Sequence, residues 1–278
     1  MHKDRRLLAF SHIPKTAGTT LNMILKRHFG FHHIAVEHRT KRPLYTQRDL
    51  SIDLKLHPRA ESLAGHTLKP FVDFGRNDER LVWYTFLRDP IDRFVSHYQH
   101  QFTSGITKFH VPFVEWMQMY ERQNWMVRML AGEEDVEAAK QILTTRMHFV
   151  GFTDQFDESL ILLRYFLQVH DMEVDYSNPT NISSKNGIRK HIAEHMDDYK
   201  GEIIDRNSLD IELVRFAMDK IWTRQVAQYG ADRLAIDRDV LFRQARLGFV
   251  ERCNVWKYVA YRNMIYKPYV WIDRKYLL

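Results

Sequence analysis

Residues 80–87, RLVWYTFL, constrain the fold most, because they are rich in β-branched and aromatic side chains and form the strongest predicted strand. Asp89-Pro90 follows and is typical of a helix start, since proline at the first helical position needs no backbone hydrogen bond. Apolar runs and helical patterns alternate in this way over the first two-thirds of the chain. The alternation predicts an α/β fold in which a central parallel sheet is flanked by helices. We expect strands at residues 7–11, 62–65, 80–87 and 148–152, and helices at about residues 19–29, from residue 90, and at 154–169, 188–198 and 208–229.

The chain of 278 residues is long enough to bury a full hydrophobic core. Its 45% hydrophobic and 27% charged residues are ordinary for a globular protein, which excludes a disordered or fibrous class. No internal repeat and no low-complexity linker divides the sequence. We therefore expect a single domain at residues 1–235 and a C-terminal extension, residues 236–278, packed on it.

Compartment and partner class are only broadly constrained. Cys253 is the only cysteine, which excludes an internal disulfide and favours a reducing compartment. No stretch approaches the ~20 apolar residues that span a bilayer, and the apolar run at residues 7–10 is too short for a secretory signal. We expect a soluble, unprocessed, cytoplasmic protein. The net charge of +6 favours a polyanionic partner, without choosing among nucleic acid, acidic lipid, acidic polysaccharide and a phosphate-rich cofactor.

The segment from residue 249 onward interleaves aromatic and basic residues. Such a pattern can hold a sugar chain, a single-stranded nucleic acid or a membrane surface. The same pattern also arises when the aromatic side chains pack onto the domain and the charges face water. Both interpretations stay open at the level of sequence.

A first motif lies between a predicted strand and a predicted helix, at residues 12–20, HIPKTAGTT. The first turn of a helix has unpaired N–H groups and a partial positive charge, so it can bind an anion. Gly18 allows close approach of a ligand, the threonines add hydroxyl groups, and Lys15 adds a mobile charge. In the loop of nucleotide triphosphatases the lysine follows the second glycine, whereas here it precedes the glycine. The alternative is a threonine-rich helix cap.

A second motif, LRDPIDRFVSHY at residues 87–98, joins another strand to another helix. Arg88 leaves the carboxyl end of the strand, where open α/β sheets bind ligands, and Ser96 lies about two turns into the helix. A guanidinium and a hydroxyl group together suit a phosphate. Arg93 is four residues from Asp89, and we expect the two to form a structural pair.

Together the motifs PKTAGTT and LRDPIDRFVSHY closely resemble those of the sulfotransferases that use 3′-phosphoadenylyl sulfate (PAPS). The resemblance is strongest to the carbohydrate branch, which includes the heparan sulfate 2-O- and 6-O-sulfotransferases. The segment HFVGFTDQFDESLILL, residues 148–163, extends it, so that it covers roughly residues 5–230 and excludes the aromatic tail. It implies an α/β domain with a loop, similar to the P-loop, that binds the 5′-phosphosulfate.

The resemblance also implies roles for individual residues. Lys15 would contact the bridging and sulfuryl oxygens and support the leaving phosphate. Arg88 and Ser96 would hold the 3′-phosphate, and a later loop at residues 181–186, with Ser183 and Lys185, would close over the nucleotide. The 5′-phosphosulfate would be held by Thr16, Ala17, Gly18, Thr19 and Thr20.

Sulfuryl transfer to an alcohol needs a base for the hydroxyl proton. His66 stands at the place where the heparan-type enzymes carry their catalytic histidine, directly after the predicted strand 62–65; its alternative role is to cap a helix near Thr67. His12 is the second choice. His97 and His100 have the spacing of metal ligands on a helix, but no acidic or cysteine partner is evident, so we expect a solvated face and no metal.

The favoured hypothesis is an enzyme that transfers the sulfuryl group of PAPS to a carbohydrate hydroxyl and releases 3′-phosphoadenosine 5′-phosphate (PAP). A kinase or other phosphoryl transferase is the first alternative, and a non-catalytic binder of polyanions or membranes is the second. The expected acceptor is a glycan or a glycolipid, with no nucleic acid partner and with a peripheral membrane contact through the C-terminal tail. A bacterial cytosolic enzyme that acts on a lipid-linked or secreted-glycan precursor fits these expectations.

Overall fold

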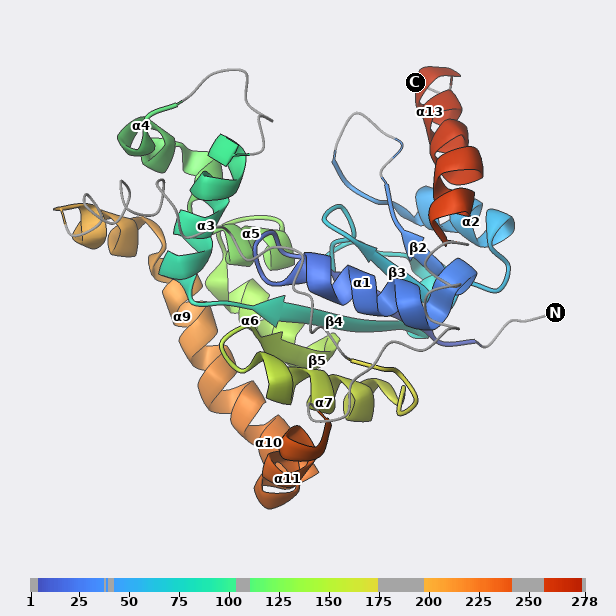
Figure 1. The fold of residues 1–278 in the computed structure, drawn as a ribbon. Coiled ribbons are helices and arrows are strands. Elements are labelled where there is room, and N and C mark those ends of the chain that lie inside the picture. The colour runs from blue at the N-terminus through green and yellow to red at the C-terminus, as the bar shows by residue number, and fades with distance from the viewer. Residues whose placement is uncertain are drawn as a thin grey trace.

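The computed structural model describes residues 5–37, 39, 43–103, 111–174, 198–241 and 258–276. Its centre is a five-stranded sheet in the order β2-β3-β1-β4-β5, and every strand pair in it is parallel. The α/β fold with a helix-flanked parallel sheet, predicted from the sequence, is thereby confirmed (Figure 1). The strands are β1 (Leu7–Ser11), β2 (His33–Ala35), β3 (Ser62–Gly65), β4 (Leu81–Leu87) and β5 (Met147–Phe152).

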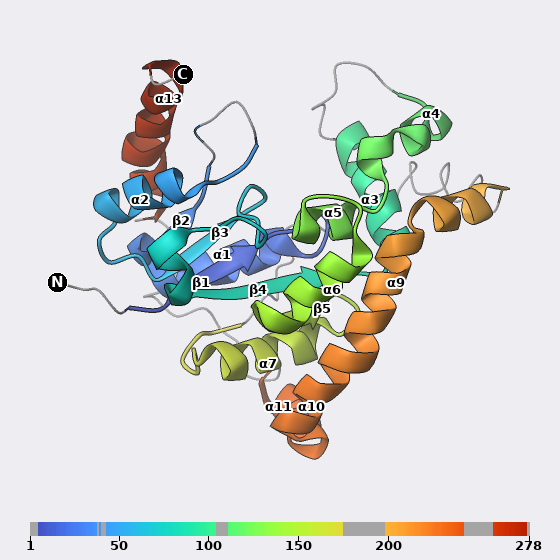
Figure 2. The same cartoon turned by 180° about the vertical axis from the view of Figure 1, so that it is seen from behind.

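The sheet separates two hydrophobic clusters, and β1 contributes to both because its side chains alternate between the faces. Leu8 and Phe10 pack with α1 (Gly18–Phe29) and α7 (Phe156–Leu167) on one face. Leu7 and Ala9 pack on the other face with α5 (Trp125–Ala131), α6 (Val136–Thr145) and α2 (Gln47–Leu56). Figure 1 shows α1 and α7 on the near face, and Figure 2 shows α5 and α6 from behind. Helices cover both faces, which is why β4 is a continuous apolar run.

The remaining elements surround this core. A third cluster joins α3 to α4 through Phe94, Tyr98 and Trp116. The helix predicted at 208–229 is present, with a π-helical turn in its middle. The elements are η1 (Gly30–His32), η2 (Gly75–Arg80), α3 (Pro90–Thr103), α4 (Phe113–Gln118), η3 (Tyr120–Arg122), α9 (Ser208–Phe216), η4 (Ala217–Trp222), α10 (Thr223–Tyr229), α11 (Ala231–Leu241), η5 (Arg262–Tyr266) and α13 (Lys267–Tyr276).

All four predicted strands are present. Two have the predicted bounds, and the other two differ from the prediction by one residue at their start. The sequence patterns missed β2, because three residues are too few to show an alternation, and they missed α2, α4, α5, α6, α11 and α13. The helix expected at 188–198 falls almost entirely outside the described residues. The expected domain boundary at residue 235 lies inside α11.

Within the described ranges, no helix combines the length and the apolar character that crossing a bilayer requires.

Candidate active site

Three loops that carry predicted site residues meet at the carboxyl edge of the sheet. Ser11, the last residue of β1, pairs with Gly65 of β3 on one side and with Thr85 of β4 on the other. Because the strands are parallel, the loops that follow them emerge at one edge, where open α/β sheets bind ligands. The loop after β1 therefore lies between His66, which follows β3, and Arg88, which follows β4.

The loop after β1 contains two residues in the left-handed region. Lys15 has a φ of 71° and Ala17 a φ of 60°, a conformation that non-glycine residues rarely adopt outside functional turns. Thr16, between them, is fully buried, and its Oγ1 donates a hydrogen bond to the carbonyl of Ile13 at 2.9 Å. Such turns direct successive N–H groups into an anion-binding concavity. The side chain of Thr16 thus supports the turn, so any contact of Thr16 with a ligand would come from its backbone.

The start of α1 continues this concavity. The helix begins at Gly18 with no side-chain cap and no acidic residue in its first turn, whereas α2 is closed by a capping box. Uncapped N–H groups at a helix start carry partial positive charge and attract anions. A β-carbon at Gly18 would overlap the ring of His12, so only glycine fits there. Thr19 and Thr20 add hydroxyl groups in the same turn.

The sequence Arg88-Asp89-Pro90 forms the junction between β4 and α3. Asp89 caps α3, since its Oδ1 accepts a hydrogen bond from the N–H of Asp92 at 2.9 Å, and Pro90 is the first helical residue. Arg88 is half-buried, and its Nη1 donates to the carbonyl of Lys15 at 3.2 Å. This contact joins the two sequence motifs. The ion pair of Arg88 with the exposed Asp92, at 3.9 Å, is weak.

Ser96 lies on α3 and is half-buried. Two steps of four residues, from Arg88 to Asp92 and from Asp92 to Ser96, place it on the side of α3 that follows Arg88. The structure therefore puts Arg88 in contact with the carbonyl of Lys15, and Ser96 lies on α3, the helix that follows Arg88.

Arg93 does not form the pair expected with Asp89. Its side chain is fully buried, and the ion pair found for it among the described residues joins its Nε to Oδ2 of Asp210 at 3.9 Å. The prediction was wrong because the face of α3 that carries Arg93 packs against α9. The buried carboxylate of Asp210 lies on that helix and forms the pair.

Six side chains of basic residues influence one another around the loop after β1: Lys15, His66, Lys69, Arg88, His97 and His100. Burial, reinforced by Arg88, lowers the pKa of Lys15. Burial, then Arg93, Arg122 and Lys15, lower the pKa of His97, and partial desolvation and the charge of Lys15 lower the pKa of the exposed His100. Burial lowers the pKa of Lys69 to about 8. At neutral pH the positive charge among these six residues lies on Lys15, Lys69 and Arg88, and an anion placed among these three is favoured.

His66 presents one ring nitrogen as a base. Its Nδ1 lies 2.8 Å from the carbonyl oxygen of His12, and because a carbonyl can only accept, Nδ1 carries the proton. Nε2 of the neutral ring is then the nitrogen with a lone pair. His66 is exposed at this edge; partial desolvation, with Lys69 and His100, lowers its pKa, although the bond to His12 opposes the change. The ring is therefore neutral at neutral pH and able to take up a proton.

His12 supports this arrangement. Its ring stacks on Phe10 with a centroid distance of 5.3 Å and lies 3.9 Å, centroid to centroid, from the ring of His66. Burial, then His66 and Lys15, lower its pKa well below the usual value. The ring packing of His12 thus fixes the position of this residue, whose backbone carbonyl sets the tautomer of His66.

The expectation of a solvated face for His97 and His100 was wrong for His97. His97 is buried between the rings of Trp116 and Trp125, and burial lowers its pKa to about 3. His100 is exposed, as expected. Hydropathy missed the burial of His97 because α4 and α5, which cover it, were not predicted.

Lys69 and His100 lie close to the candidate site, although neither was predicted to belong to it. Lys69 follows His66 by three residues, and its Nζ contacts the sulfur of Met129. One signal was present for His100, because it lies four residues after Ser96 on the same helix and therefore shares its face.

Two predicted residues cannot be placed at the site. Ser183 and Lys185, with the rest of the loop 181–186, lie outside the described residues. Over the described part of the chain, no three histidine, cysteine, aspartate or glutamate side chains are arranged to hold a metal ion.

Comparison with known proteins agrees with this geometry. The model of the sulfotransferase family matches residues 1–217, a span that contains both motifs, His66 and all five strands. A search of curated proteins finds no match. The family match covers most of the chain, and the chain therefore belongs to the sulfotransferase family, whose members transfer a sulfuryl group to an acceptor.

Proposed function

We propose that this protein transfers the sulfuryl group of PAPS to a hydroxyl group of a carbohydrate acceptor. The observation that carries the proposal is the convergence at one sheet edge of an uncapped helix start, two cations and a neutral histidine. The uncapped start belongs to α1, the cations are Lys15 and Arg88, and the histidine is His66.

The residues present fit the donor. PAPS carries an anionic phosphosulfate on the 5′-oxygen of its ribose and a phosphate on the 3′-oxygen, and the chain offers two cationic residues, Lys15 and Arg88, that are joined by the hydrogen bond from Arg88 to the carbonyl of Lys15. The turn at 15–17 and the start of α1 would hold the phosphosulfate, with N–H groups and with the hydroxyl groups of Thr19 and Thr20. Arg88 and Ser96 would hold the 3′-phosphate. When bound, PAPS supplies the sulfuryl group, and PAP is the product.

The side chains then divide the remaining chemistry. Nε2 of His66 accepts the proton of the acceptor hydroxyl while the new S–O bond forms. Lys15 stabilises the negative charge that grows on the phosphate oxygen as the old S–O bond breaks. Because burial and Arg88 already disfavour the charge on Lys15, its ammonium group gains most from this developing negative charge.

Replacing Arg88 by alanine is expected to weaken PAP binding by about 10- to 100-fold, the value of a charge-assisted hydrogen bond. Isothermal titration calorimetry with PAP measures this change. Arg76→Ala is the matched control, because Arg76 is exposed near the amino end of β4, at the opposite edge of the sheet. Failure of the unaltered protein to bind PAP, or equal affinity in Arg88→Ala, would rule out the proposed donor site.

Replacing Lys15 by alanine is expected to lower kcat by about 10²–10³-fold, the cost of removing one group that stabilises transition-state charge. The measurement is transfer from labelled PAPS under saturating donor and acceptor. Lys55→Ala, on the exposed side of α2, should keep the original rate. A Lys15→Ala protein with unchanged kcat would show that another group supports the leaving phosphate.

The acceptor class belongs to the same proposal. We infer a glycan or glycolipid hydroxyl, a cytoplasmic site of action and a peripheral contact with the membrane, which together suit a lipid-linked precursor. A screen of glycan acceptors with labelled PAPS tests this inference. Transfer only to non-carbohydrate alcohols would contradict it, and turnover of ATP with Mg²⁺ in place of PAPS would point to a phosphoryl transferase.

A further inference from the structure

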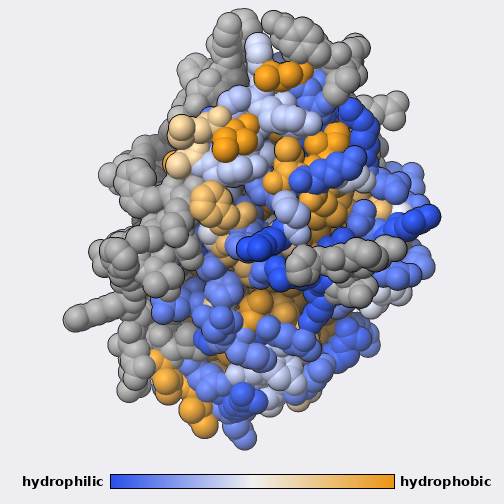
Figure 3. All heavy atoms as spheres, turned by 90° about the vertical axis from the view of Figure 1, so that its right-hand side faces the viewer, coloured by the Kyte–Doolittle hydropathy of each residue, from blue (hydrophilic) through white to orange (hydrophobic). Residues whose placement is uncertain are grey.

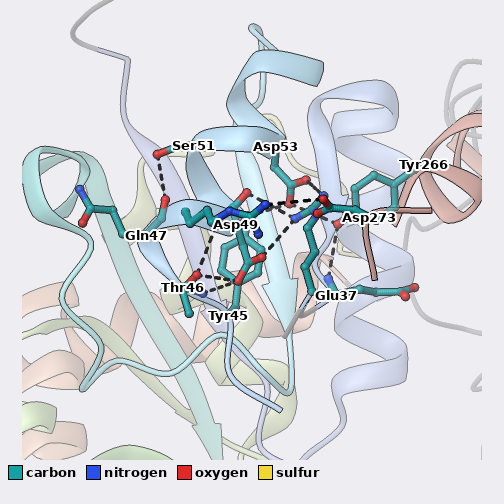
Figure 4. Close-up of polar contacts among 11 residues, drawn as sticks. Glu37, Tyr45, Thr46, Gln47, Asp49, Ser51, Asp53, Tyr266 and Asp273 are labelled. Atoms are coloured by element: carbon teal, nitrogen blue, oxygen red, sulfur yellow. Dashed lines mark hydrogen bonds and ion pairs between the residues drawn. The ribbon is translucent and has the colours of Figure 1, made fainter. Parts of the chain in front are cut away.

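The C-terminal helical segment, residues 258–276, is held on the domain by a buried polar network. The guanidinium of Arg39 is fully buried, and its Nε lies 3.1 Å from Oδ2 of Asp273 in α13. The same guanidinium contacts Oδ1 of Asp53 at 2.5 Å and Oδ1 of Asp49 at 3.7 Å, both from α2 (Figure 4). Separating a buried charge from its partner strongly destabilises the fold, so this network fixes the helix in one orientation.

Further polar contacts fix the same face. The hydroxyl of Tyr266 donates to Oδ2 of Asp53 at 3.2 Å, and Nη2 of Arg262 lies 2.7 Å from Oε1 of Glu37. Val270 packs into the core beside them and is 1% exposed. The inner face of the helix is therefore defined by specific partners, and the helix cannot roll to bury its opposite face without breaking them.

The opposite face is apolar and exposed. Met264 is 77% exposed, Ile265 55%, Trp271 60% and Ile272 49%. Steps of seven residues relate Met264 to Trp271 and Ile265 to Ile272, so the four side chains form one stripe along the helix. Figure 3 looks onto the side of the molecule from which α13 rises, and apolar side chains gather in its upper part. We call these four residues the outer stripe.

The charge of this segment complements an anionic surface. Residues 258–276 contain four basic residues and one acidic residue; Asp273 faces Arg39 and Arg262 faces Glu37, which leaves Lys267, Arg274 and Lys275 as the basic residues of the segment to meet an anionic surface. Lys267 is exposed, and Arg274 and Lys275 follow in the last turns of α13. Two copies of the segment would bring like charges together, which disfavours a self-association through this face. Tryptophan and tyrosine side chains beside basic residues are typical of helices that lie at a lipid–water interface.

We propose that the outer stripe seats this protein on the surface of a bilayer that contains anionic lipids. The helix lies in the interface and does not cross the membrane. Both ribbon views place α13 beside α2 and away from α3 and α5, so the seated protein keeps the carboxyl edge of the sheet clear of the contact (Figures 1 and 2). The proposal does not depend on sulfuryl transfer.

Co-sedimentation with vesicles tests the proposal. The full chain is mixed with vesicles of phosphatidylcholine alone or with one third phosphatidylglycerol, and the bound fraction is measured against salt. We expect the protein to bind the anionic vesicles, with an affinity about fivefold higher for each basic residue that reaches the surface. This affinity should fall as the salt concentration rises. Equal binding to neutral vesicles, or no binding to either, would overturn the proposal.

The triple variant Met264→Ser/Trp271→Ser/Ile272→Ser should bind the anionic vesicles at least about tenfold more weakly, since it removes most of the apolar area. Ile236→Ser/Val240→Ser is the matched control, because these side chains are 64% and 52% exposed on α11, a helix with three aspartates and two arginines. Each variant must keep the thermal midpoint and the PAP affinity of the unaltered protein. Equal binding of the anionic vesicles by the triple variant would overturn the proposed role of the stripe. If the unaltered protein instead forms a dimer that the triple variant loses, and binds no vesicles, the stripe has a different role. Failure to bind PAP would count only against the proposed donor site.

Discussion

Replacing His66 by alanine is expected to lower kcat by about 10²–10⁴-fold, the usual contribution of a well-placed base. PAP affinity should stay unchanged, because the hydrogen bond that joins His66 to the loop after β1 ends at the backbone carbonyl of His12, outside the turn at 15–17 that would hold the nucleotide. Transfer from labelled PAPS measures the rate, and calorimetry measures the affinity. His170→Ala is the control, since His170 is an exposed histidine at the end of α7.

The pH profile distinguishes a base from a structural group at this position. The pKa of His66 lies below 6.5 because of desolvation and of the charges on Lys69 and His100, so the ring is neutral above that lowered pKa. Activity should therefore be full at neutral pH and fall only as the pH drops through a value below 6.5. In His66→Ala this acid limb should disappear. Wild-type turnover in His66→Ala would show that the base is another group, with His12 as the next candidate.

Replacing Asp210 by alanine is expected to lower the free energy of unfolding by about 3–5 kcal/mol, because it removes one partner of a buried ion pair. Asp210 is fully buried, and it faces Nε of Arg93 at 3.9 Å. Its carboxylate also caps α5, accepting from the N–H groups of Met126 at 3.1 Å and Val127 at 2.9 Å. Burial raises the pKa of Asp210, while Arg93 and these two amides oppose the rise. The residue thus connects α3, α5 and α9.

Urea unfolding followed by circular dichroism measures the loss. Asp210→Asn should lose less than Asp210→Ala, because its amide oxygen can still accept from the start of α5. The double variant Arg93→Met/Asp210→Ala should recover part of the loss, since it no longer buries an unpaired charge. Asp219→Ala, at an exposed position of η4, should stay within about 0.5 kcal/mol of the original. A loss in Asp210→Ala no larger than this control would show that the pair is not stabilising.

The sequence alone predicted four of the five strands and the loops that follow β1 and β4, since these depend on short-range patterns. The strands at 7–11 and 62–65 have the predicted bounds, because runs of buried residues mark a strand covered on both faces. The start of α3 was equally clear, since Asp89 and Pro90 are a cap and a first helical residue within one turn of each other. Local chemistry also placed Lys15 and Arg88 correctly at the ends of their strands.

Only the tertiary structure decided how these residues act on one another. The tautomer of His66 depends on a carbonyl 54 residues away, and the contact between Arg88 and Lys15 spans 73 residues. Arg93 pairs with Asp210 and not with Asp89, and His97 is buried, because α5 and α9 pack on α3 from distant parts of the chain. Hydropathy and helix periodicity describe a residue's near neighbours, whereas a buried charge, a ring tautomer and a lowered pKa are set by whatever the fold brings within a few ångströms.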